Sequence, residues 1–180
     1  MVESLVARAR ALGRAELMEL WQVIQAGSAG DWPPGNALEH LILRAFEIEG
    51  AEVTRPYPIR RDGETLEQID GAVHADGLHC LIESKDTDGA VNLEPIAKLR
   101  NQLLRRHCSV VGCVFSRRGF TQPASTLAQF VGPQLILLWT GPEISYVLER
   151  GAFIRALRRK YRVAIEYATP DHDVTTEDFR

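Results

Sequence analysis

The first part of the chain carries apolar residues at helical spacing. Over residues 2–26 they recur about three or four positions apart and predict two helices that meet near Gly13. Glycine and proline are concentrated in the segment 27–35, which is typical of a loop. Asn36 then stands at a favoured helix N-cap position, with Glu39 three residues later. The pattern predicts a helix that starts at Asn36 with a capping box.

Extended segments follow this helix, which is expected to end at Gly50. Turn sequences separate them, first at residues 61–64 (Arg-Asp-Gly-Glu) and then at Asp76-Gly77. Because Asp-Gly readily supplies the two positive φ angles of a type I′ turn, Asp76-Gly77 predicts a two-residue hairpin. The three predicted strands cover residues 52–60, 66–75 and 78–85.

Helices and strands alternate in the rest of the chain. The run Ser109–Phe115 is apolar and valine-rich, which is typical of a strand buried on both faces. The alternation predicts an α/β domain with a mixed sheet, antiparallel in its first hairpins and parallel where the helix that starts at Leu93 crosses over. A polar tail, 169–180, is expected to fray. The predicted elements are a helix over 93–107, a strand over 109–115, a helix over 123–131, a strand over 134–140 and helical segments over 143–167.

The predicted hairpin brings two acidic residues together. If its turn has two residues, Ala75 faces Leu78 and, counting outwards, Asp70 faces Glu83. Directly opposed side chains have Cβ atoms about 5 Å apart, so two carboxylates would repel each other across the strands. A divalent cation removes that repulsion, because Mg²⁺ binds carboxylate oxygens and completes its shell with water and substrate phosphate. The pair therefore predicts a magnesium site.

The second strand of the hairpin adds a cation to this face. Residues two apart point the same way, so Lys85 accompanies Glu83, and Gln68 is expected opposite Lys85. The residues Leu78, Cys80 and Ile82 then face the core. A metal ion with a neighbouring ammonium suits phosphodiester hydrolysis, because the metal activates water and the ammonium stabilises developing negative charge.

These residues resemble the signature of the PD-(D/E)xK restriction-endonuclease-like superfamily. Gln-Ile-Asp70-Gly is followed, after twelve intervening residues, by Ile-Glu83-Ser-Lys85, an acid on one strand and E-x-K on the next. The order helix, three strands, helix, strand also matches the superfamily core. In members with an acidic residue on the first helix, that residue assists the metal through water, and Glu39 is the matching position.

The resemblance implies a function as well as a fold. It implies a DNA endonuclease that uses Mg²⁺, with Mn²⁺ as a substitute, in prokaryotic defence or DNA repair. It makes residues 36–168 a nuclease-like domain, preceded by a helical extension and loop over 1–35 and followed by the polar tail. Whether the chain acts alone or as a homodimer stays open.

One segment indicates a particular subgroup of the superfamily, and other positions differ from the superfamily pattern. The segment 114–124 (VFSRRGFTQPA) is similar to the strand-to-helix loop of Mrr-like members. Ile69 replaces the proline of the motif name, which removes no metal ligand. Many Mrr-like members have Gln at the position of Glu83. Gln102 is the candidate for a Gln that some members carry on the following helix, and it is also a candidate nucleic-acid contact.

Simpler interpretations accompany several of these residues. Glu39 also fits the capping box, which requires it for helix stability alone. Asp86 and Asp88 are explained by a turn before the next helix. Arg117 and Arg118 fit either a phosphate contact or a solvated loop. Other basic residues at 55–61, 98–106 and 155–162, among them Lys98 as a candidate nucleic-acid contact, have the same two interpretations.

Composition limits the remaining possibilities. The chain has 180 residues, 45% hydrophobic and 25% charged, which fits one folded domain. A net charge of −3 does not by itself indicate nucleic-acid binding. Three cysteines without C-x-x-C spacing favour buried thiols over disulfides or zinc. With no apolar run near the ~20 residues that cross a bilayer, the cytoplasm is the expected location.

Two other functions compete with the DNA endonuclease. The same site suits a nuclease that acts on RNA or branched DNA. A catalytically inactive module that binds nucleic acid or protein would keep the fold without cleavage, although Asp70, Glu83 and Lys85 fill all three core motif positions.

Overall fold

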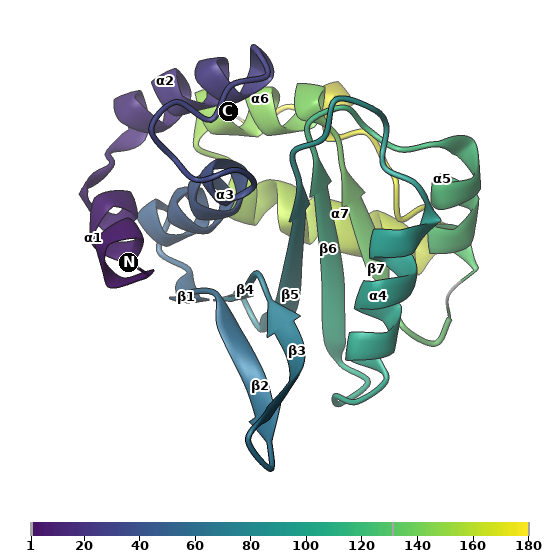
Figure 1. Ribbon diagram of the computed structural model, residues 1–180. Helices are drawn as coiled ribbons and strands as arrows, with labels where there is room; N and C mark the ends of the chain where they lie inside the picture. Colours follow the sequence, from purple (N-terminus) through teal and green to yellow (C-terminus); the bar gives the residue numbers. More distant parts are fainter. Residues whose placement is uncertain (1, 131, 180) are drawn as a thin grey trace.

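A computed structural model describes residues 2–130 and 132–179, with side chains from residue 4 onwards (Figure 1). Its centre is a five-stranded sheet of order β1-β4-β5-β6-β7. The strands β1, β4 and β5 are antiparallel, whereas β5, β6 and β7 are parallel, which confirms the predicted mixed sheet. The sheet strands are β1 (Glu52–Thr54), β4 (Gly71–Ala75), β5 (Leu78–Lys85), β6 (Val110–Ser116) and β7 (Ile136–Trp139).

Helices cover both faces of this sheet (Figure 1). On one face lie α3 and α7, with α2 and α6 packed beside them, and on the other face lie α4 and α5. The predicted order of the helices and of the last two strands is confirmed, with shifts of a few residues at the ends. The helices are α1 (Val2–Ala11), α2 (Arg14–Gln25), α3 (Asn36–Ile48), α4 (Leu93–Leu103), α5 (Gln122–Gln129), α6 (Gly141–Arg150), α7 (Phe153–Tyr167) and the short 3₁₀ helix η1 (Val174–Thr176). Residue 131, the predicted end of a helix, lies outside the described residues.

The β4–β5 hairpin has the predicted register. Asp76 and Gly77 have φ angles of 50° and 78°, as a type I′ turn requires, and Ala75 pairs with Leu78. The antiparallel pairing continues to Gly71 and Ile82, where it ends. The residues just beyond this last pair are both acidic: Asp70 precedes Gly71, and Glu83 follows Ile82.

Two of the three predicted strands are wrong as continuous strands. Each is divided in two, and β2 (Tyr57–Arg61) and β3 (Glu64–Ile69) form a separate two-stranded sheet that projects from the main one (Figure 1). Pro56 stands at the first break, where a residue without a backbone N–H cannot continue the ladder. As a result Gln68 pairs with Pro58 of β2 and does not lie opposite Lys85, which corrects that prediction.

The second break lies at Asp70, where the chain passes from β3 to β4. Gly71 allows the chain to pass close to α3, because a Cβ at this position would lie 2.6 Å from a methyl carbon of Leu43. The helix α3 therefore packs directly against the corner that carries Asp70.

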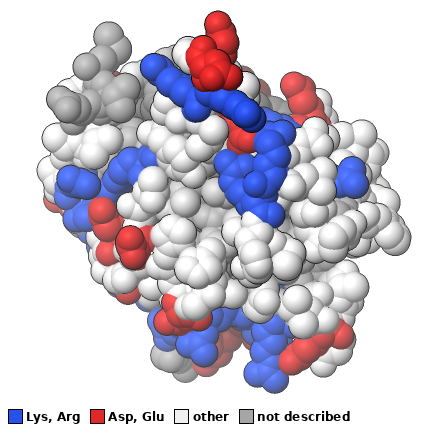
Figure 2. All heavy atoms as spheres, turned by 90° about the horizontal axis from the view of Figure 1, so that it is seen from below, with Lys and Arg blue, Asp and Glu red and all other residues white. Residues whose placement is uncertain are grey.

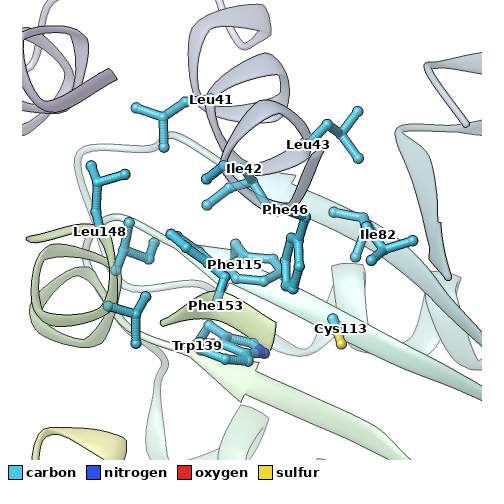
Figure 3. Close-up of a cluster of buried hydrophobic side chains, with 14 of the residues drawn as sticks. Leu41, Ile42, Leu43, Phe46, Ile82, Cys113, Phe115, Trp139, Leu148 and Phe153 are labelled. Carbon is cyan, nitrogen blue, oxygen red and sulfur yellow. The ribbon is translucent and has the colours of Figure 1, made fainter. Parts of the chain in front are cut away.

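Two apolar clusters hold the layers together. The larger one lies between the sheet and the α3, α6 and α7 side, and Figure 3 shows Phe46, Phe115, Trp139 and Phe153 at its centre. Their rings are in contact, with centroids 5.1 Å apart for Phe46 and Phe153 and for Phe115 and Trp139. The smaller cluster lies between the other face and α4 and α5. Its buried members are Ile69, Ala72, Leu81, Ile96, Leu99, Leu103, Val114, Ala124, Ala128, Ile136 and Leu138.

Two end regions differ from the sequence-based predictions. Asn36 is the first residue of α3, and the N-cap is Gly35, whose φ of 81° suits glycine, so the capping box predicted from Asn36 is wrong. The tail is packed against the domain instead of frayed. Val174 is fully buried and its N–H donates to Glu143, while the N–H of Leu138 donates to the carbonyl of Pro170. None of the helices in the described part of the chain has the length and apolar character needed to cross a membrane.

Candidate active site

The strand β5 presents its acidic and basic side chains on the α4 side of the sheet. Cys80 and Ile82 belong to the larger apolar cluster, whereas Leu81 belongs to the smaller one on the α4 side. Glu83 and Lys85 follow Leu81 at steps of two, so the alternation of a strand places them on one face, as the sequence predicted, and this face is turned toward α4.

Asp70 lies at the corner between β3 and β4, one residue beyond the last pair of the hairpin. The N–H of Ser84 donates to its carboxylate at 2.9 Å, which fixes the acid beside the end of β5. Burial raises the pKa of Asp70, and the negative charge of Glu83 raises it further. Asp70 and Glu83 are therefore electrostatic neighbours, although Asp70 belongs to neither strand.

Glu83 is almost completely buried, with 1% of its surface exposed, and two ammonium groups neutralise it. Lys85 Nζ lies 2.7 Å from Oε1, and Lys98 Nζ lies 2.7 Å from Oε2 and 3.0 Å from Oε1. Lys85 comes from the same strand, whereas Lys98 reaches across from α4. The contact of Lys98 with Glu83 was not predicted, because sequence spacing alone does not show which helix residue reaches a given strand residue.

Glu39 approaches the same group from α3. It is 9% exposed, and among the described residues its Oε1 has no hydrogen-bond partner. Burial raises the pKa of Glu39 to about 8, and the charge of Asp70 adds to the effect while a hydrogen bond from Asn36 opposes it. Glu39 of α3, Asp70 of the corner between β3 and β4, and Glu83 of β5 thus lie close enough for their negative charges to repel.

A depression opens beside this group on the α4 side. Its volume is about 380 Å³, and Lys85 and Lys98 line one side of it. The loop 87–92 and the first turn of α4, with Glu94 and Pro95, line the remainder. α4 starts here because Asn92 caps it, accepting a hydrogen bond from the N–H of Glu94 at 3.0 Å. Solvent therefore reaches the lysines, although Glu83 itself is buried.

The donor atoms of this site suit a hard divalent cation. Carboxylate oxygens are the ligands that Mg²⁺ prefers, and the buried Oε1 of Glu39 has an unused lone pair. Within the described residues, no group of three His, Cys, Asp or Glu side chains forms a ready metal cage.

The other candidate contacts lie elsewhere. Arg117 is buried, 7% exposed, and pairs with Asp86 and Asp88, so these three residues form a network between two loops. Arg118 is exposed. Gln102 is buried on α4, where its amide donates to the carbonyl of Gln68 at 3.2 Å and fixes α4 to β3.

Charge is unevenly distributed over the surface. Figure 2 shows the molecule from below, with Lys and Arg side chains in several groups, one of them near the middle of that face, and acidic side chains between the groups. Some cations of the described residues have acidic partners. Arg105 and Arg106 of the segment after α4 both pair with Glu67 of β3, which ties the projecting hairpin to α4. The net charge of −3 therefore hides local basic regions.

Comparison with known proteins gives a family and a fold. A family model described as restriction endonuclease (Mrr_cat) matches residues 34–148. No curated protein sequence matches the chain.

Among solved structures, the small subunit of the heterodimeric restriction endonuclease R.BspD6I is similar over 90% of this chain and 92% of its own, with 10% identity and a TM-score of 0.57. A protein of unknown function, AF1548, is similar over 73% of this chain and 77% of its own, with 18% identity and a TM-score of 0.45. The DNA modification-dependent restriction endonuclease AspBHI is similar over 87% of this chain and 41% of its own, with 15% identity and a TM-score of 0.46.

Proposed function

Because this chain belongs to the restriction endonuclease family, we propose that it is an endonuclease that hydrolyses phosphodiester bonds of DNA with the help of a divalent metal ion. The observation that carries the proposal is the meeting of Asp70, Glu83 and Glu39 beside Lys85 at the edge of an open depression. Acidic groups are brought together at a cost in stability, which is typical of functional sites.

Each residue has a role in this proposal. Asp70 and Glu83 would hold Mg²⁺, for which Mn²⁺ can substitute, and Glu39 would assist the ion through water. When bound, the ion would supply Lewis acidity toward a phosphoryl oxygen and toward a water that becomes the nucleophile. Lys85 lies 2.7 Å from Glu83 and is open to the depression, where its ammonium stabilises negative charge that develops on the phosphate.

The surrounding elements complete the proposal. Residues 36–168 form the nuclease domain, and 1–35 and 169–180 are its extension and tail. Among the basic residues, Arg118 and Lys98 are exposed enough to contact DNA backbone phosphates, whereas Arg117 and Gln102 position loops and helices through contacts within the protein. Prokaryotic defence or DNA repair is the setting, and a homodimer is the form in which two such sites would cut both strands.

Cleavage of supercoiled plasmid DNA tests this function. Mg²⁺ is expected to support cleavage and EDTA to abolish it. Asp70→Asn and Lys85→Met are each expected to lower the rate by about 10²-fold or more, the usual cost of losing a group that stabilises developing charge. Asp62→Asn, the same chemical change at an exposed hairpin tip 93% open to solvent, is the matched control and should cleave like the unchanged protein.

Three outcomes would contradict the proposal. DNA binding without cleavage would favour the inactive binding module. Faster cleavage of RNA or branched DNA would change the substrate, and cleavage that survives both EDTA and Asp70→Asn would place the active site elsewhere.

A further inference from the structure

The carboxylate of Glu83 already contacts two ammonium groups, which compete with a metal ion for its oxygens. Its two oxygens accept from Lys85 at 2.7 Å and from Lys98 at 2.7 and 3.0 Å, so both are engaged by ammonium groups. The side chain is 1% exposed and cannot turn toward solvent. A divalent cation that binds Glu83 must therefore replace at least one ammonium, since two cations on one carboxylate oxygen repel each other.

The two lysines are not equally able to leave. Lys85 is held by a short connection, because it lies two residues from Glu83 on the same strand, and its surroundings include the charges of Asp70 and Glu94 as well. Lys98 reaches Glu83 from a different element, α4, and 40% of its side chain is exposed against 32% for that of Lys85. It stands on the wall of the 380 Å³ depression, into which it can turn.

We infer that Lys98 acts as a displaceable counter-ion: it occupies Glu83 in the metal-free protein and moves into the depression, onto a non-scissile phosphate of the DNA, when a divalent cation binds. This inference rests on the proposed function. It makes the binding of metal and the binding of DNA favour each other, because the ammonium that the metal releases becomes a phosphate ligand. Coupling of this kind is reciprocal between the two ligands.

Lys98→Met in the full chain tests the inference, since it removes the ammonium and keeps most of the side chain. Isothermal titration with Mn²⁺ in the absence of DNA should show metal binding about tenfold tighter than in the unchanged protein, because the competing cation is gone. Binding of a DNA duplex in the presence of Ca²⁺ should weaken, and its salt dependence should lose about one phosphate contact.

Two further variants keep the test decisive. Lys98→Arg retains the charge and should keep the metal affinity of the unchanged protein, which also serves if Lys98→Met folds poorly. Arg100→Met removes an exposed cation from the same helix, away from Glu83, and should leave the Mn²⁺ affinity unchanged.

Failure of the inference and failure of the proposed function give different results. If the unchanged protein cleaves DNA and Lys98→Met binds Mn²⁺ with the same affinity, Lys98 is a static ion-pair partner and this inference alone is overturned. If the unchanged protein binds no divalent cation, the proposed function and the inference are both overturned.

Discussion

In the part of the chain that the structure describes, two buried glutamates, Glu83 and Glu143, pair with lysine, and they lie on opposite faces of the sheet. Glu143 and Lys160 are 2% and 0% exposed and 2.6 Å apart. Lys160 also donates to the carbonyls of Leu138 and His172 at 2.6 Å, and Glu143 accepts from Thr140 and from the N–H of Val174. The polar atoms of this pair are satisfied within the protein.

The pair at Glu83 is incomplete by comparison. One carboxylate receives two ammonium groups whose side chains are 32% and 40% exposed, and two more acids, Asp70 and Glu39, lie nearby with raised pKa values. A buried ion pair whose hydrogen bonds are all filled has no capacity for a ligand. The group around Glu83 differs from the pair of Glu143 and Lys160 in three ways: it has additional acidic groups, an oxygen of Glu39 without a partner, and an adjacent depression. These features suit a site that binds a ligand, and the difference between the two groups can be tested directly.

The largest expected change in stability follows from breaking the pair of Glu143 and Lys160. Lys160→Met leaves the buried carboxylate of Glu143 without its counter-ion and should lower the free energy of unfolding by about 3–5 kcal/mol. Urea denaturation followed by circular dichroism measures the change. A loss under 1 kcal/mol would mean that the remaining hydrogen bonds to Glu143 are sufficient, and the contrast between the two pairs would be broken.

A smaller effect, dependent on pH, is expected at the open site. Between about pH 4.5 and about pH 8 the unfolded chain releases the Glu39 proton while the metal-free folded protein retains it, so this residue lowers the free energy of unfolding as the pH rises. Glu39→Gln removes that loss. Relative to the unchanged protein in EDTA, it should gain about 2–3 kcal/mol on going from pH 4.5 to pH 7.

Thermal or urea unfolding of both proteins across this pH range measures the difference. Burial lowers the pKa of His40 to about 4, so the contribution of His40 to the free energy of unfolding decreases as the pH falls. Because His40 is present in both proteins, this contribution cancels in the difference between them. Parallel stability curves would show that Glu39 does not retain its proton in the folded state.

The smallest effect is expected for the lysine that the open site is proposed to release. Lys98→Met should change the free energy of unfolding by less than about 1 kcal/mol, because its side chain is 40% exposed and Lys85 still neutralises Glu83. Urea denaturation beside Lys160→Met compares the two lysines in one experiment. A loss as large as that of Lys160→Met would make Lys98 a structural residue and remove the difference between the two pairs.

Much of the fold could be predicted because it depends on local chemistry. The Asp76-Gly77 turn fixed the register of β4 and β5, and this register brings Asp70 and Glu83 to one place even though the pairing ends at Gly71. Family membership confirms the resemblance on which the restriction-endonuclease-like fold was predicted. The breaks at Pro56 and Asp70 were missed, because a continuous β pattern does not show where a strand leaves one sheet for another.

The contacts around the acids could not be predicted in the same way. Lys98, Gln102 and Arg117 were candidates for nucleic-acid contacts, and the sequence did not show their partners within the protein, which are Glu83, the carbonyl of Gln68 and two aspartates. A long basic side chain reaches several partners from one backbone position, and only the packing of α4 and the loops against the sheet selects among them.

By itself, the sequence determined the order of the elements, the hairpin register and the identity of the acidic residues, since these follow from turn residues and from the alternation of apolar and polar positions. The tertiary structure decided which charges neutralise one another, which carboxylates are buried enough to hold a proton, and which lysines line an open depression. Burial and charge pairing depend on the approach of distant segments, and no local pattern specifies that approach.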